Sequence, residues 1–130
     1  MNYSALIQNR KSVRAFTDRY VSFDDMDKIK AYHRNSVRRL LPELKTELRL
    51  FGLDARAVLE GAAGYKQFLV GSPQYMVLLS EKHPHAVENA GFVMEDLILK
   101  LTDMGLDSCW LTFNDSEYMK TALEIDSPLD

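Results

Sequence analysis

The chain has 130 residues, of which 46% are apolar and 27% are charged, a composition that suits one globular domain with a hydrophobic core. Its net charge is −3 and no long basic block exists, which argues against general nucleic-acid affinity through phosphate neutralisation. No apolar run approaches the roughly 20 residues that span a bilayer. A single cysteine, Cys109, excludes an internal disulfide and fits a reducing cytoplasm.

Helices are predicted for most of the first 41 residues. Residues 2–9 suit a short helix with Leu6 and Ile7 turned inward. Ser22 is expected to begin the next helix, because the acidic residues that follow it favour the positive N-terminal end and the apolar residues are spaced three apart. His33 falls on the polar face of that helix and is interpreted as structural. Residues 37–41 are predicted to form a further short helical piece.

Two strands are predicted in the middle of the chain. Residues 46–51 alternate between apolar and polar, which indicates a half-exposed strand ended by Gly52. Residues 55–64 are ambiguous, with a strand followed by a loop as the interpretation. Residues 75–79 are continuously apolar, a pattern that predicts a central strand covered on both faces.

The clearest element is a long helix over residues 86–104, whose apolar residues repeat at threes and fours before Gly105 stops it. A short buried strand is expected over residues 109–113, with the Trp110 side chain in the core. Asn114, three residues before a glutamate, is predicted to cap a last helix. Because helices and strands mix without strict alternation, the predicted fold class is α+β.

A basic motif follows the first predicted helix. Arg10, Ser12 and Arg14 are spaced two apart, so an extended backbone would point all three the same way. Two guanidinium groups flanking a hydroxyl are well suited to bind a phosphate ester. Lys11, one residue out of phase, is expected to face solvent or a carboxylate. A solvated tail or an anion-binding interaction module remain alternative interpretations of this motif.

The order of four motifs resembles the nitroreductase family. Arg-x-Ser-x-Arg-x-Phe occupies residues 10–16, and Gly-Leu-x-Ser-x-Trp-Leu follows the long helix at residues 105–111. Between them, Gly-Tyr-x-x-Phe at residues 64–68 leads into Gly-Ser-Pro at residues 71–73, which is similar to the thermophile-type branch. The resemblance implies a mixed, largely antiparallel central sheet flanked by helices, with a long central helix.

The same resemblance implies FMN held without covalent attachment at the interface of a homodimer, with NAD(P)H as transient electron donor and a small oxidised acceptor such as a nitroaromatic or quinone. It implies no catalytic side chain, because flavin N5 carries the hydride. Leu111 and Thr112 would contribute main-chain atoms behind the ring, whereas packing of a turn is an equal interpretation for Ser72. The implied cofactor-binding residues are Arg10, Lys11, Ser12, Arg14, Ser72, Pro73, Trp110, Leu111 and Thr112, with Tyr65 and Phe68 near the ring or substrate mouth.

Chains of this family are usually longer, so residues 1–130 are expected to form a single nitroreductase-like domain that is incomplete at the C-terminus. This expectation motivates an alternative function, a non-catalytic truncated flavin-binding or assembly module. No metal site is predicted, because His83 and His85 lack a carboxylate or thiol cluster beside them. Cys109, inside an apolar segment, is interpreted as an inert thiol.

Overall fold

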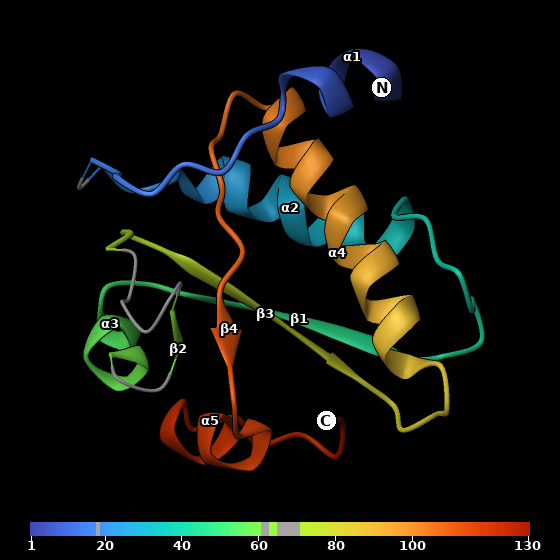
Figure 1. Cartoon of the computed structure of the whole chain (residues 1–130), viewed down its shortest axis with the longest axis vertical. Coiled ribbons are helices and arrows are strands. Elements are labelled where there is room, and N and C mark those ends of the chain that lie inside the picture. The colour runs from blue at the N-terminus through green and yellow to red at the C-terminus, as the bar shows by residue number, and fades with distance from the viewer. Residues whose placement is uncertain (18, 61–62, 65–70) are drawn as a thin grey trace.

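Figure 1 shows the chain as a computed structural model, which describes residues 1–17, 19–60, 63–64 and 71–130. Helices and strands mix along the chain, so the predicted α+β class is confirmed. None of the helices in these ranges is long and apolar enough to cross a membrane. The elements are α1 (Tyr3–Asn9), α2 (Phe23–Asn35), β1 (Thr46–Phe51), α3 (Asp54–Leu59), β2 (Ala63–Gly64), β3 (Tyr75–Ser80), α4 (Ala86–Asp103), β4 (Thr112–Phe113) and α5 (Ser116–Ala122).

The antiparallel pair β1–β3 separates two apolar clusters, an upper cluster with α2 and α4 and a lower cluster with α3 and α5 (Figure 1). Alternate residues of β3 face opposite sides: Tyr75 and Leu79 pack with α3 and α5, whereas Met76 and Leu78 pack with α2 and α4. The prediction that this strand is covered on both faces is therefore confirmed. Its expected central place is wrong for the described strands, where β3 pairs with β1 alone.

The long helix α4 carries the upper cluster and contacts α1, α2 and β3. Its residues Val93 and Leu97 are fully buried. Gly105 ends the helix as predicted: its φ of 79° lies in the left-handed region, and the Leu106 N–H donates to the Leu101 carbonyl at 2.8 Å. The chain therefore reverses sharply and returns alongside the N-terminal segment.

Two buried polar residues of α4 bind the backbone that follows α2. Asp96 Oδ2 accepts hydrogen bonds from Arg38 N at 2.8 Å and from the Tyr32 hydroxyl at 2.9 Å. Asn89 Oδ1 accepts one from Leu41 N at 2.8 Å. Burial raises the pKa of Tyr32, and the hydrogen bonds to Tyr3 and Asp96 raise it further, so the phenol stays protonated and donates.

These contacts explain why the helical piece predicted for residues 37–41 is wrong. The N–H groups of Arg38 and Leu41 are satisfied by α4 side chains instead of by carbonyls one helical turn earlier. Residues 55–64 were a second wrong interpretation, because residues 54–59 form α3. Ala55 and Leu59 of this helix are four residues apart and both buried, which is the helical spacing.

Ile7 of α1 is 63% exposed and does not turn inward as predicted. His33 is buried, with 8% of its surface exposed, and does not lie on a polar face as predicted. Its Nε2 shares a hydrogen bond of 2.9 Å with Thr46 Oγ1, which joins α2 to the start of β1. Burial lowers the pKa of His33, and the positive charges of Arg39 and Arg34 lower it further.

The lowered pKa predicts a loss of stability in acid. Between the folded pKa and the ordinary value of about 6.5, the unfolded chain binds more protons, so stability rises with pH in that window. We expect Tm to fall as the pH is lowered through 6.5. His33→Gln keeps a donor for Thr46 but cannot titrate, so the variant should lose this part of the slope. Thermal unfolding followed by circular dichroism tests this, and equal slopes in both proteins would contradict it.

Candidate functional site

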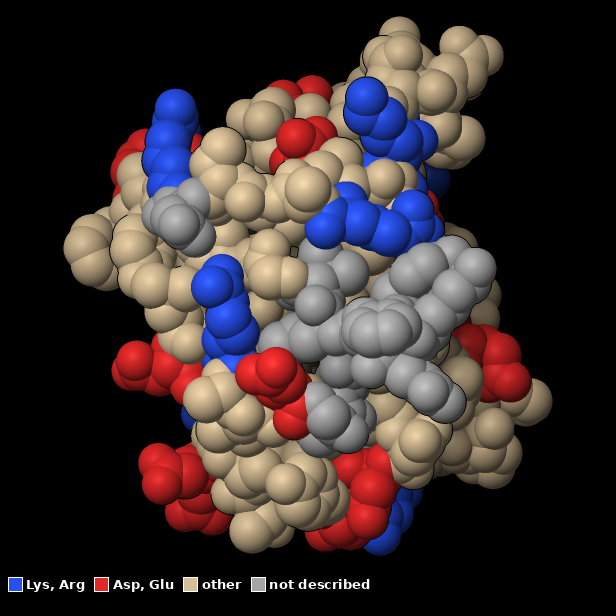
Figure 2. All heavy atoms as spheres, turned by 60° about the vertical axis from the view of Figure 1, so that its left-hand side comes forward, with Lys and Arg blue, Asp and Glu red and all other residues tan. Residues whose placement is uncertain are grey.

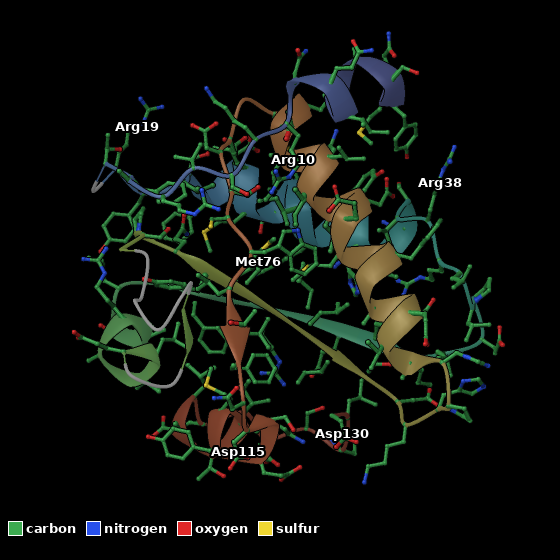
Figure 3. All side chains as sticks on the ribbon, viewed as in Figure 1. Arg10, Arg19, Arg38, Met76, Asp115 and Asp130 are labelled. Atoms are coloured by element: carbon green, nitrogen blue, oxygen red, sulfur yellow. The ribbon has the colours of Figure 1, made fainter. Side chains whose placement is uncertain are left out.

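The basic motif and the tryptophan-bearing segment lie side by side. After α1 the chain is extended from Arg10 onward, and Ser12 forms a parallel β-bridge with Ser108. The Val13 N–H donates to the Ser108 carbonyl at 3.0 Å. Figure 3 shows Arg10 where the N-terminal segment crosses the chain that leaves α4. We call this place the Arg10–Ser108 junction, formed by Arg10, Ser12, Val13 and Ser108.

The junction contains two buried polar atoms without hydrogen-bond partners among the described residues, Arg10 Nε and Ser108 Oγ. The Arg10 Nη2 donates to Ser12 Oγ at 3.4 Å, which is a long contact. A buried donor left unsatisfied costs about 1–3 kcal/mol, more when it is charged. Such atoms need an explanation in a native structure, and the cationic Arg10 guanidinium makes a bound anion one candidate.

Two further cations of the motif lie closer to solvent. Lys11 and Arg14 are exposed, whereas Arg10 and Ser12 are half-buried. Figure 2 looks onto this side of the molecule, where lysine and arginine side chains gather mainly in its upper half. The positive charge there can attract an anionic ligand, and the half-buried Arg10 can bind it.

The segment 109–113 differs from its prediction. Only Thr112 and Phe113 form a strand, β4, which pairs antiparallel with β2. Trp110 is 43% exposed and Phe113 is 52% exposed, so the predicted buried strand with a core tryptophan is wrong. Leu111 packs against the lower cluster and anchors the segment. The exposed aromatic side chains of Trp110 and Phe113 offer apolar surface to a ligand ring or to another chain.

Ser72 and Pro73 form a turn before β3. The Ser72 hydroxyl donates to the Gln74 carbonyl at 2.8 Å, and the Ser72 carbonyl accepts from Arg56 Nη2 at 2.7 Å. Pro73 is buried. These contacts give the turn a local packing role, and its contact with a cofactor stays a prediction. Tyr65 and Phe68 lie outside the described residues.

Reasoning from the sequence missed Ser108 as a site residue. A signal was present, because Ser108 stands inside the motif that ends at Trp110, and its position directly after the glycine turn brings it back toward α1. The cap of the last helix was also displaced by one residue. Asp115, and not Asn114, accepts the hydrogen bond from Tyr118 N, at 3.0 Å.

Solved structures resemble this fold. A nitroreductase family protein from Clostridium novyi NT has a TM-score of 0.80 at 20% identity, covering 99% of this chain and 79% of its own. A nitroreductase with bound FMN from Bacteroides fragilis NCTC 9343 scores 0.70 at 17% identity, covering 95% and 79%. Iodotyrosine deiodinase bound to FMN and 3-iodo-L-tyrosine scores 0.74 at 18% identity, covering 100% and 84%.

Sequence comparison gives the family itself. None of the curated proteins matches the chain. The family described as "Putative TM nitroreductase" matches residues 2–127, a range that includes both the basic motif and the tryptophan-bearing segment. The match spans nearly all of the chain and agrees with the fold of the solved structures. The chain therefore belongs to the Putative TM nitroreductase family.

Proposed function

We propose that the chain is an FMN-dependent oxidoreductase that takes hydride from NAD(P)H and passes electrons to a small oxidised acceptor such as a nitroaromatic or quinone. Family membership and the FMN named in similar structures support the cofactor. The observation that carries the proposal is the pair of buried, unpartnered groups at the Arg10–Ser108 junction. A phosphate monoester has the charge and the acceptor oxygens that this pair lacks.

Each residue then has a distinct task. The Arg10 guanidinium binds the phosphate, while Ser12 and Ser108 donate hydroxyl hydrogen bonds to it. Arg14 and Lys11 supply positive charge at the solvent side, near the phosphate and the pyrimidine edge of the ring. The main chain of Leu111 and Thr112 backs the ring, beside the exposed Trp110. FMN when bound supplies the N5 position that takes up and releases hydride.

We further propose that a second copy of the chain completes the site. Trp110 and Phe113 leave about half of their side chains exposed on the segment that would back the ring. On α4, Val87 and Phe92 are exposed as well, and open space surrounds Gly91, so a second helix could approach closely. A homodimer would cover apolar surface of this kind. The single, half-buried Cys109 is compatible with a reducing cytoplasm.

One observation favours the alternative of a non-catalytic flavin-binding or assembly module. The wall formed by Trp110 and Phe113 is uncovered in the isolated chain, and the Ser72 hydroxyl is already bonded within its own turn. A chain of this kind would bind flavin weakly or only after assembly. Reduction by NAD(P)H separates the two functions, because the module would bind FMN without accepting electrons from the nicotinamide.

FMN titration of the purified protein tests the proposal. At a free concentration a hundredfold above Kd, FMN should stabilise the fold by about 2.7 kcal/mol, and Tm should rise accordingly. Riboflavin is the matched ligand, since it has the same ring and lacks the phosphate, and it should give a much smaller shift. NADH or NADPH should then bleach the flavin absorbance. No shift with FMN, or equal shifts with both ligands, would count against the phosphate site.

A further inference from the structure

We propose that the chain has a second anion site, separate from the Arg10–Ser108 junction, that binds the pyrophosphate group of a small soluble metabolite. The site is a depression of about 380 Å³ between the C-terminal half of α2 and the start of β1. Its volume lies within the range of small-molecule sites. We call it the α2–β1 depression. Its lining includes Lys30, His33, Arg34, Arg39, Thr46 and Glu47.

Arg39 is held in place before any ligand arrives. Its guanidinium donates through Nη1 to Thr46 Oγ1 and through Nη2 to the His33 carbonyl at 2.8 Å. Two contacts from different elements fix the planar group, so little side-chain entropy remains to be lost on binding. Among the described residues, these two are the hydrogen bonds of the Arg39 guanidinium, which has further N–H groups that can donate to an anion.

The charge of the depression is positive and uncompensated. Lys30 and Arg34 stand one helical turn apart on α2, so two like charges lie on the same face. The helix dipole stabilises the positive charge of Arg34, which lies in the last turn of α2. It stabilises the charge of Lys30 less, because Lys30 lies before that turn, and Arg39 lies outside the helix. Within the described ranges, none of these three cations has a carboxylate at ion-pair distance.

The one carboxylate in the lining is already paired. Glu47 Oε2 lies 3.2 Å from Arg49 Nη2 and also accepts from Arg49 Nε. It therefore does not neutralise Lys30 or Arg34. Three cations from α2 and from the loop after it thus line a space in which the carboxylate of Glu47 is paired with Arg49, which suits an anion with more than one charge, such as a pyrophosphate.

Binding of inorganic pyrophosphate, measured with FMN present in excess, tests this site. Backbone amide NMR should show shifts at residues 30–34 and 46–47, and the isotherm should give a measurable Kd at low salt. The double variant Lys30→Gln with Arg34→Gln removes two exposed cations and should bind about tenfold more weakly. Its FMN affinity should stay unchanged, which separates this site from the proposed flavin site.

The matched control is Lys28→Gln with Lys82→Gln, which changes the net charge equally and removes exposed lysines outside the lining. This control should bind pyrophosphate like the unmodified protein. Equal weakening in both double variants would mean a general charge effect and would overturn the proposal. Shifts confined to residues 10–14 and 108, or no binding at millimolar pyrophosphate, would overturn it too.

Discussion

Replacing Arg10 and Arg14 together by alanine is expected to raise the Kd for FMN by a factor of about 100 or more. A hydrogen bond to a charged group contributes about 1.5–3 kcal/mol, so two lost contacts amount to about 3–6 kcal/mol. Without FMN, the Arg10→Ala substitution by itself should leave the stability nearly unchanged, because Arg10 Nε is buried without a partner among the described residues and its removal relieves that cost. Fluorescence titration and urea unfolding measure the two quantities.

The control for this variant is Arg19→Ala with Lys82→Ala, which removes the same charge. Figure 3 places Arg19 at the far end of the extended segment, away from Arg10. This control should keep its FMN affinity within about twofold, a change of about 0.4 kcal/mol. A structural role for Arg10 and Arg14 would give the opposite result: lower stability without FMN, and an FMN affinity that changes no more than in the control.

Leu97→Ala should produce the largest loss of stability in the chain. Leu97 is fully buried between α2 and β3, where it packs with Ile29 and Val93. Truncating a buried leucine removes its transfer free energy and leaves a cavity, at a cost of about 2–5 kcal/mol. A small domain has a total stability of about 5–15 kcal/mol, so the variant would be marginal at 37 °C. Urea denaturation followed by circular dichroism gives the difference.

Val87→Ala on the same helix is the comparison for Leu97. Val87 is 83% exposed, so its truncation removes little packing and should change the free energy of unfolding by about 0.5 kcal/mol or less. Helix propensity favours alanine over either residue by at most about 0.7 kcal/mol, so it does not account for a difference of about 2 kcal/mol or more. Similar losses in the two variants would show that the packing of α4 against α2 and β3 is not what stabilises the fold.

Elements with a long, regular apolar period were predictable from the sequence. The long helix follows from its apolar spacing and its end from Gly105, and the start of α2 follows from Ser22, whose side chain accepts a hydrogen bond from Asp25 N. The short helix α3 was not predictable in this way. It has six residues and no side-chain cap at Leu53, so its local signal is weak and tertiary packing of Ala55 and Leu59 decides its form.

The candidate site likewise has a part that the sequence predicts and a part that depends on tertiary structure. The alternation of Arg10, Ser12 and Arg14 predicts a phosphate site, which stays a prediction, and the resemblance linked this motif to the segment around Trp110, which the structure places beside it. That the partner of Ser12 is Ser108 depends on the angle at which the chain leaves α4, a tertiary property. The prediction for Trp110 was wrong because an apolar segment is buried only where other elements pack on it, and Trp110 is 43% exposed.

The bridge between Ser12 and Ser108 fixes the two segments through a single residue pair. One extra residue between Gly105 and Asp107 would shift the segment that returns from α4 by one position. The acidic Asp107 would then replace Ser108 opposite Ser12. A carboxylate at that position would pair with the Arg10 guanidinium and exclude an anionic ligand. The number of residues after the helix is thus as decisive for ligand choice as their chemistry.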